Sequence, residues 1–248
     1  MSETQVYSMP KAWYADVHTH YCPGCTHGVA HRLLAEAIGE LDIQNKTMGV
    51  APVGCAVLMH QYLDVDFIEA PHGRAPAAAT AMKVVMPDKV VFTYQGDGDL
   101  ASIGMSEIVH AMNRNLPLTI IFINNAIYGM TGGQMAPTTL LGQKSTTTPA
   151  GRDAKVNGYP IRMCELLATL EGPAYIERVA ASQPKYIMKA RQAVVKAFKN
   201  QKEGKGVSFV EILSTCPTNW GMSPVDAGRW LEENMIPHYP LGVYKDFE

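Results

Sequence analysis

A carboxylate and an amide side chain follow two apolar segments near the middle of the chain. Residues 90–94 lead into a Gly-Asp-Gly-Asp sequence that contains Asp97, and residues 118–123 lead into an Asn-Asn pair that ends with Asn125. Both apolar segments are predicted to be buried strands, and the spacing of residues 105–113 predicts a helix that connects them. Asp97 and Asn125 should therefore project from the carboxyl ends of neighbouring parallel strands, where open α/β sheets bind ligands.

The oxygen atoms at this edge of the predicted sheet suit a magnesium ion that holds a diphosphate. Magnesium prefers hard oxygen ligands, which Asp97, Asn125 and a backbone carbonyl of the following turn, assigned to Ile127, would supply. Gly96 and Gly98 let the backbone come close to phosphate oxygens, and the N-terminus of the next helix favours their negative charge. A Gly-Asp-Gly sequence alone is most often a turn, but here a strand precedes it and the Asn-Asn pair follows the next strand.

A Cys-Pro-Gly-Cys turn near the N-terminus brings the thiols of Cys22 and Cys25 to one point. From the residues alone, three interpretations are open. The two thiolates could bind zinc together with one or both of the histidines that precede them. They could instead join Cys55 and Cys216 as the four ligands of an iron–sulfur cluster, or they could be free thiols in a turn.

The Gly-Asp-Gly-Asp sequence at 96–99, followed by Asn-Asn-Ala-Ile-Tyr-Gly-Met-Thr-Gly-Gly-Gln at 124–134, resembles the β subunit of the 2-oxoacid:ferredoxin oxidoreductases, of the branched-chain 2-oxoacid or 2-oxoglutarate type. The shorter pattern of Gly-Asp-Gly and Asn-Asn is that of thiamine diphosphate enzymes. The resemblance extends from Cys22 to about Tyr239. It implies an α/β fold with a doubly wound, mostly parallel sheet and helices on both faces, in a diphosphate-type domain that binds thiamine diphosphate.

The resemblance also implies three cofactors and the residues that bind them. Thiamine diphosphate would contact Gly54, Cys55, His72, Gly96, Asp97, Gly98, Asp99, Asn125, Gly129 and Met130. Mg²⁺ would be bound by Asp97, Asn125 and Ile127. One [4Fe-4S] cluster would be bound by Cys22, Cys25, Cys55 and Cys216, and this resemblance places the cluster ahead of zinc.

Four further residues near these motifs carry weaker expectations. Arg74, in the His-Gly-Arg segment, either contacts the cofactor or braces its loop. Cys164 lies on an apolar helical face and is expected to be a small buried hydrophobe. His27 and His31 lie one turn apart on a predicted helix, where capping or packing is expected rather than metal binding.

The reaction that the resemblance implies is the thiamine diphosphate-dependent oxidative decarboxylation of a 2-oxoacid, with coenzyme A, to acyl-CoA and CO₂. Electrons would pass through the [4Fe-4S] cluster to ferredoxin, in anaerobic metabolism. No residue of this chain resembles the glutamate that activates the cofactor in thiamine enzymes, where it normally comes from a different domain. We therefore expect a heteromer in which the chain is active only with an α subunit, with or without further γ or δ subunits.

Two other functions remain open at this point. A non-redox thiamine diphosphate-dependent 2-oxoacid decarboxylase half would share the region 96–125 but would have no use for four cysteines. A non-catalytic subunit would use the Cys-Pro-Gly-Cys turn as a structural zinc knuckle. As for the substrate, residues 128–139 contain no Lys or Arg that would pair with a second carboxylate, which favours an apolar 2-oxoacid over 2-oxoglutarate.

Length and composition exclude several classes of protein. The chain has 248 residues and a net charge of −2, so it can bury a large core and carries no nucleic-acid footprint. Apolar stretches are too short to span a membrane, and residues 1–13 are too polar for a signal peptide. The five cysteines, an odd number, argue against a disulfide framework, and a cytoplasmic protein is expected.

Three regions are expected along the chain: an N-terminal arm at 1–17, the cofactor-binding domain at 18–219, and a tail at 220–248 that contacts a partner subunit. Residues 140–160 lack periodicity and predict a long functional loop. Helices are expected near 29–41, 55–62, 77–82, 161–170 and 184–200, and further strands at 48–51, 174–179 and 207–213.

Overall fold

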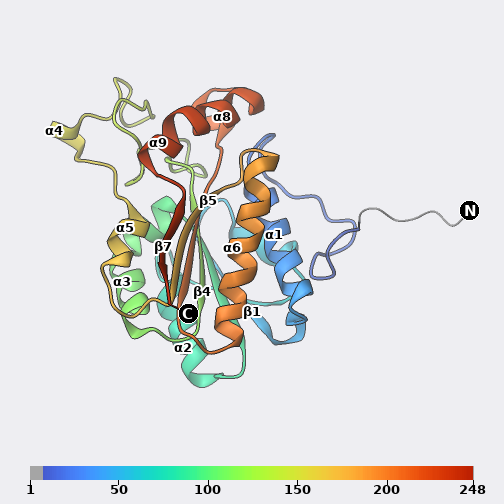
Figure 1. Ribbon diagram of the computed structural model, residues 1–248. Helices are drawn as coiled ribbons and strands as arrows, with labels where there is room; N and C mark the ends of the chain where they lie inside the picture. Colours follow the sequence, from blue (N-terminus) through green and yellow to red (C-terminus); the bar gives the residue numbers. More distant parts are fainter. Residues whose placement is uncertain (1–7, 248) are drawn as a thin grey trace, which may run out of the picture.

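A computed structural model describes residues 8–247, which form a central sheet between two layers of helices (Figure 1). The first seven residues of the expected N-terminal arm lie outside the described part. The seven strands have the order β2-β1-β3-β4-β6-β5-β7, and all neighbours are parallel except β5 and β7. Their bounds are β1 Thr47–Ala51, β2 Asp66–Glu69, β3 Val90–Gly96, β4 Thr119–Asn124, β5 Tyr175–Ala180, β6 Ser208–Leu213 and β7 Gly242–Asp246.

Helices cover both faces of the sheet, as the predicted doubly wound fold requires (Figure 1). One face carries α1 (His27–Glu40) and α6 (Pro184–Lys202), and the other carries α2 (Ala75–Val85), α3 (Met105–Arg114) and α5 (Met163–Ala168). The helix α3 connects β3 to β4 as predicted, after a π-helical turn at Asp99–Ile103 (η3).

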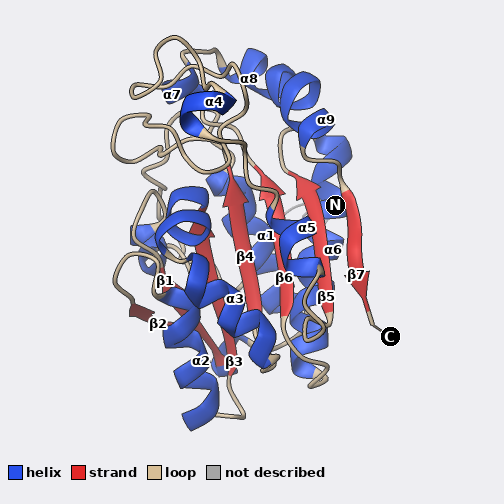
Figure 2. Cartoon of the chain, turned by 90° about the vertical axis from the view of Figure 1, so that its left-hand side faces the viewer, coloured by secondary structure: helices blue, strands red, loops and turns tan. Residues whose placement is uncertain are grey.

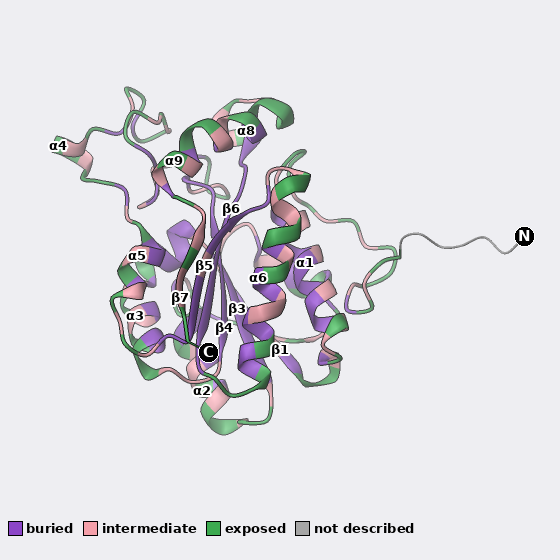
Figure 3. Cartoon of the chain, in the orientation of Figure 1, coloured by how far each residue is buried: buried purple, intermediate pink, exposed green. Residues whose placement is uncertain are grey.

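The central strands are apolar along their whole length because both of their faces are covered. Figure 3 shows the buried residues concentrated in these strands. On one face, Phe92 of β3 meets Phe198 of α6 edge to face, with ring centroids 5.8 Å apart. On the other, Phe122 of β4 stacks on Phe209 of β6 at 5.7 Å. Burial of each such ring contributes about 1.5–3 kcal/mol, and it fixes the height at which β3 and β4 end.

Two elements differ from the sequence-based expectation. Residues 55–62 were expected to form an α-helix but contain only a 3₁₀ turn, Val57–Gln61 (η2), and another 3₁₀ turn, Gln44–Lys46 (η1), precedes β1. The edge strand β2 was not predicted, because most of its four side chains are exposed and leave no apolar run in the sequence.

The segment 140–160 is a long loop, as predicted, and it contains one helical turn, α4 (Ala154–Asn157). A single side chain holds it together. The guanidinium of Arg152 is buried and donates to backbone carbonyls on both sides of the loop, including those of Thr139 at 2.7 Å and Tyr159 at 2.9 Å. The backbone is therefore ordered by internal hydrogen bonds rather than by a regular element.

The C-terminal tail showed no regular period in the sequence, yet it has regular structure and packs on its own domain (Figure 2). Leu231, Met235 and Tyr239 are buried against the carboxyl ends of the strands. The strand β7 then pairs antiparallel with β5. The tail elements are α7 Pro217–Trp220, α8 Pro224–Trp230, a π-helical turn Leu231–Met235 (η4) and α9 Ile236–His238. Contact with a partner subunit stays a prediction.

Of the helices within residues 8–247, none combines the length and the apolar character that crossing a membrane requires.

Candidate functional site

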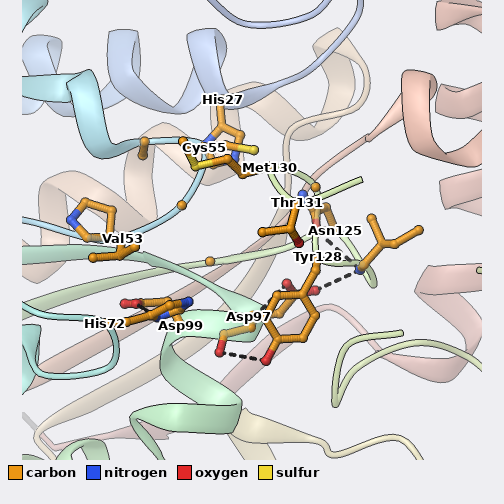
Figure 4. A pocket seen from close by; sticks show the side chains of 17 residues that line it. His27, Val53, Cys55, His72, Asp97, Asp99, Asn125, Tyr128, Met130 and Thr131 are labelled. Carbon is orange, nitrogen blue, oxygen red and sulfur yellow. Dashed lines mark hydrogen bonds and ion pairs between the residues drawn. The ribbon is translucent and has the colours of Figure 1, made fainter. Parts of the chain in front are cut away.

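A cavity opens at the carboxyl ends of β3 and β4, where Asp97 and Asn125 were expected (Figure 4). Every residue expected to contact thiamine diphosphate lines this cavity, and so does Ile127. The cavity holds about 110 Å³, whereas sites that enclose a cofactor-sized ligand hold about 300–1,000 Å³. The chain therefore encloses only part of such a ligand.

Asp97 and Asn125 converge on a single backbone N–H. The amide of Ile127 donates to Oδ2 of Asp97 at 3.1 Å and to Oδ1 of Asn125 at 3.3 Å. Between Asn125 and Ile127, Ala126 adopts a left-handed conformation with φ of 56°, which turns the chain sharply after β4. Two strand ends thus present a carboxylate and an amide oxygen side by side.

The carboxylate of Asp97 is buried and well supplied with donors. Its Oδ1 accepts from the backbone of Gly98 at 2.9 Å, and its Oδ2 accepts from the hydroxyl of Thr138 at 2.7 Å. Burial nevertheless raises the pKa of Asp97 to about 6, against these hydrogen bonds, which lower it. A divalent cation would favour the ionised form, and the neighbouring amide oxygen is a hard ligand. The residues present fit Mg²⁺.

The glycines of this site are needed for different physical reasons. A Cβ added to Gly96 or to Gly54 would meet nothing within 4 Å, so both face open space in which phosphate oxygens would fit. A Cβ on Gly98 would lie 2.1 Å from the ring of Tyr128. Gly98 is therefore required by the ring that packs on it, and Tyr128 returns a hydrogen bond to the Gly98 carbonyl at 3.2 Å.

Asp99 lines the cavity, but its oxygens are engaged within the protein. Oδ1 accepts from the backbone of Gly73 at 2.8 Å and contacts the ring of His72, which lies beside it in Figure 4. Oδ2 accepts from the side chain of Gln95 at 2.5 Å. Asp99 thus fixes the His72 loop at the cavity wall. Arg74 pairs with Glu107 of α3 and does not line the cavity, which favours the bracing role.

Cys22, Cys25, Cys55 and Cys216, here called the cysteine quartet, lie near one another, and Cys55 lines the cavity. A Cβ on Gly129 would lie 3.1 Å from Sγ of Cys55 and 3.6 Å from Sγ of Cys216. Burial raises the pKa of Cys25 to about 12 and that of Cys55 to about 11. The other three thiols add to the increase at Cys25, and those of Cys216 and Cys22 add to the increase at Cys55. Each thiol therefore lies within electrostatic range of the others.

Three segments carry the quartet, and hydroxyl groups join two of them that lie far apart in the sequence. Thr26, next to Cys25, contacts Ser214 through the two side-chain oxygens at 2.7 Å. Thr215, next to Cys216, donates to the carbonyl of Gly24 at 2.7 Å. The Cys-Pro-Gly-Cys turn is thereby attached to the end of β6.

The spacing of the quartet bears on which metal group it suits. Within the described part of the chain, no three His, Cys, Asp or Glu side chains are placed to hold one metal ion. A zinc knuckle needs its ligands on a single ion, whereas a [4Fe-4S] cluster takes one thiolate on each of four irons and so accepts wider spacing. The four thiols have the ligand type and number that one [4Fe-4S] cluster takes. Cys164 is buried in the core on α5, as predicted.

His27 and His31 pack against tyrosines, as expected, instead of facing a shared metal. Nδ1 of His27 lies 2.7 Å from the hydroxyl of Tyr94, and Nε2 of His31 lies 2.5 Å from that of Tyr21. Burial lowers the pKa of His27 to about 4. His27 also lines the cavity, which the sequence did not indicate.

Sequence reasoning missed two further residues at the site. Thr138, which donates to Asp97, comes from an irregular segment with no motif to mark it. Asn219, which donates to Sγ of Cys216 at 3.3 Å, lies three positions after that cysteine in the first turn of α7. A polar side chain three positions after Cys216 is typical of the first turn of a helix. This spacing was the only sign of Asn219 in the sequence.

The chain is similar to known proteins in sequence and in structure. Residues 52–212 match the family described as thiamine pyrophosphate enzyme, C-terminal TPP binding domain. The chain is 49% identical over 236 residues to ketoisovalerate oxidoreductase subunit VorA of Methanothermobacter thermautotrophicus, covering 95% of this chain and 50% of the relative. It is 37% identical over 222 residues to 2-oxoglutarate synthase subunit KorB of Methanocaldococcus jannaschii, covering 87% and 78%. The chain thus spans about half the length of the VorA relatives it matches.

A solved structure is similar over nearly the whole chain. It is 2-oxoglutarate:ferredoxin oxidoreductase from Magnetococcus marinus with 2-oxoglutarate, coenzyme A and succinyl-CoA bound. The TM-score is 0.79 at 28% sequence identity, with 97% of this chain and 86% of the other covered.

Proposed function

The chain belongs to the thiamine diphosphate-binding subunits of the 2-oxoacid:ferredoxin oxidoreductases, and we propose that it provides the diphosphate half of the active site of such an enzyme. In the proposed reaction, a 2-oxoacid, coenzyme A and two oxidised ferredoxins give acyl-CoA, CO₂, a proton and two reduced ferredoxins. The acyl–carboxylate bond breaks, a thioester forms, and the two electrons released leave one at a time.

One observation carries this proposal. Gly129 lines the same cavity as Asp97 and Asn125, and a Cβ on it would lie 3.1 Å from Sγ of Cys55 and 3.6 Å from Sγ of Cys216. A diphosphate-binding corner with the thiols of Cys55 and Cys216 beside it is of use to an enzyme that removes electrons. A simple 2-oxoacid decarboxylase would not need the quartet.

Asp97, Asn125 and the Ile127 carbonyl would hold Mg²⁺, and the open space at Gly96 and Gly54 would receive the phosphate oxygens. When bound, thiamine diphosphate supplies a nucleophilic carbon and an electron sink for decarboxylation. The residues of this chain then act by holding the reacting groups in place. Thr138 keeps the carboxylate of Asp97 oriented, and the quartet would hold the electron acceptor against the same cavity.

The site of this chain needs a second component. Among the described residues that line the cavity there is no glutamate to activate the cofactor, and the cavity encloses only part of a cofactor-sized ligand. We propose that an α subunit supplies the activating glutamate and most of the substrate pocket, and that ferredoxin accepts the electrons. The greater length of the VorA relatives is in keeping with such a partner region.

A branched-chain 2-oxoacid is the proposed substrate. The relative named for ketoisovalerate is 49% identical, against 37% for the relative named for 2-oxoglutarate. Residues 128–139 also offer no cation to a second carboxylate.

The test is to purify the chain anaerobically with its proposed α subunit and to compare ferredoxin reduction with 2-oxoisovalerate and with 2-oxoglutarate. Electron paramagnetic resonance of the dithionite-reduced enzyme, with iron and zinc analysis, is recorded on the same sample. A reduced [4Fe-4S] signal and faster reduction with 2-oxoisovalerate are expected. A clear preference for the diacid contradicts the substrate, and zinc without iron contradicts the redox function.

A further inference from the structure

We propose that Asn219 couples the thiamine site to the iron–sulfur site by binding a loop of the first and a thiolate of the second. The loop is residues 128–134, called the thiamine loop below, and the thiolate is Cys216. The inference rests on the proposed function, because it takes Cys216 as a cluster ligand and the thiamine loop as part of the cofactor site.

The side-chain amide of Asn219 makes both connections from one nitrogen. Nδ2 donates to the carbonyl of Gly129 at 2.9 Å and to Sγ of Cys216 at 3.3 Å. The backbone N–H of Asn219 also donates to the same sulfur. Asn219 is therefore a positioning residue with one donor shared between two sites and a second donor on the thiolate.

Local structure explains why Asn219 is placed this way. The helix α7 begins directly after Cys216, with Pro217 in its first turn. The N–H groups in the first turn of a helix have no partner within the helix, so the sulfur of Cys216 accepts one of them. The same turn directs the side chain of Asn219 back over the sulfur toward the cavity.

The thiamine loop lies directly on this side chain. A Cβ on Gly133 would stand 3.1 Å from Oδ1 of Asn219, and a Cβ on Gly129 would stand 3.7 Å from its Nδ2. Gly133 has φ of 85°, which favours glycine for a second reason. Gly129, Met130 and Thr131 of this loop line the cavity. A shift of Asn219 would therefore move both the wall of the cofactor site and the hydrogen bonding of the thiolate.

Two measurable consequences follow from these contacts. N–H donors to cluster sulfurs stabilise the more negative, reduced state, so loss of the Nδ2 donor makes reduction of the cluster less favourable. Loss of the bond to Gly129 also frees the thiamine loop, which must then be ordered when the cofactor binds. Asn219→Ala should alter both properties, although Asn219 is expected to touch neither the cofactor nor the iron.

The experiment uses the enzyme purified with its partner subunit. Redox titration followed by electron paramagnetic resonance gives the midpoint potential, and titration calorimetry after cofactor removal gives the Kd of thiamine diphosphate. For Asn219→Ala we expect a reduction equilibrium up to about tenfold less favourable, which is about 59 mV for one electron, and a Kd raised by up to about tenfold. Thr218→Ala, exposed on the same helix, is the control and should leave both unchanged.

If Asn219→Ala fails to hold the cluster, Asn219→Leu keeps the approximate size of the side chain without N–H donors and without adding a charge, and the potential must fall in that variant. An unchanged potential, or an unchanged Kd, in a variant that retains the cluster overturns the coupling. Absence of any [4Fe-4S] signal in the unmodified enzyme would instead refute the proposed function, and the inference with it.

Discussion

Asn124 and Glu211 are joined across β4 and β6 by a hydrogen bond of 2.8 Å from Nδ2 to Oε1. The other oxygen of Glu211 accepts from Nε of Arg178 at 2.9 Å, and both of these charged side chains are fully buried. Oδ1 of Asn124 accepts from the backbone of Ala126 at 3.2 Å. The two asparagines of the pair therefore have different tasks: the first fixes the turn after β4 to a buried ion pair, and the second lines the cavity as a proposed Mg²⁺ ligand.

Glu211→Gln is predicted to weaken both the fold and the cofactor site. A glutamine would turn an N–H toward either Arg178 or Asn124, each of which already presents a donor. Arg178 keeps its pair with Glu165, whose Oε2 lies 2.6 Å from Nη2 of Arg178, so the expected cost is about 1–3 kcal/mol for the mismatched buried hydrogen bonds. Urea unfolding should show this loss, and calorimetry on the folded protein should show weaker thiamine diphosphate binding.

The matched control is Lys185→Gln, which breaks the pair with Glu232. The ammonium of Lys185 lies 2.7 Å from Glu232 but is exposed, so its loss should cost less than about 1 kcal/mol. Equal destabilisation by the two variants would contradict the role of the buried network.

Asp97→Ala is predicted to abolish binding of Mg²⁺ and thiamine diphosphate while the fold survives. The carboxylate is held at the cavity by hydrogen bonds and is costly to ionise there, so its removal takes away a ligand without removing apolar packing. Calorimetry should show no cofactor binding, and far-ultraviolet circular dichroism should be unchanged. Asp88→Ala, on the exposed surface, serves as the control. Normal cofactor affinity in Asp97→Ala would contradict the central assignment.

The central βαβ unit could be predicted from the sequence because its strands are buried on both faces. Such strands are continuous apolar runs, and parallel topology then brings Asp97 and Asn125 to one edge. The function of the first asparagine could not be predicted in this way. Its partner Glu211 lies in another strand, and a glutamate within an apolar run gives no sign of which buried cation it meets.

Contacts made by irregular segments could not be predicted from the sequence either. Thr138 reaches Asp97 from a segment without periodicity, and Asn219 reaches the thiamine loop only because α7 is placed by the end of β6. The structure of the tail could not be predicted from the sequence for a related reason. Tyr239 is buried through a hydrogen bond to the carbonyl of Thr138 and through packing on strand ends, and contacts of this kind leave no period in the sequence.

Cys216→Ser and Cys164→Ser are predicted to have opposite outcomes. Cys216 belongs to the quartet, so its loss should strip or convert the cluster and stop ferredoxin reduction. Cys164 is buried in the core between the sheet and α5, and its replacement by serine should leave the iron content unchanged. Iron analysis and electron paramagnetic resonance of the two variants measure this directly. Loss of iron in Cys164→Ser, or full iron in Cys216→Ser, would refute the ligand set.

The buried His31 predicts how stability falls in acid. Burial lowers its pKa well below the usual value, and the groups that face it are the hydroxyl of Tyr21 and the rings of His27, Tyr62 and Tyr94. None of these groups is an anion that would stabilise a charged imidazole. The folded chain keeps His31 neutral, while the unfolded chain takes up a proton below about pH 6.5.

The stabilisation that a neutral His31 gives is therefore present above pH 6.5 and is lost as the pH falls. Between pH 7.5 and pH 5.5 this one group should cost about 1.4 kcal/mol of unfolding free energy. His31→Gln removes the titration, so its stability should decrease by about that much less over the same interval. Urea unfolding of both proteins at the two pH values measures the difference. An identical decrease in the two would mean that His31 becomes charged within the folded protein.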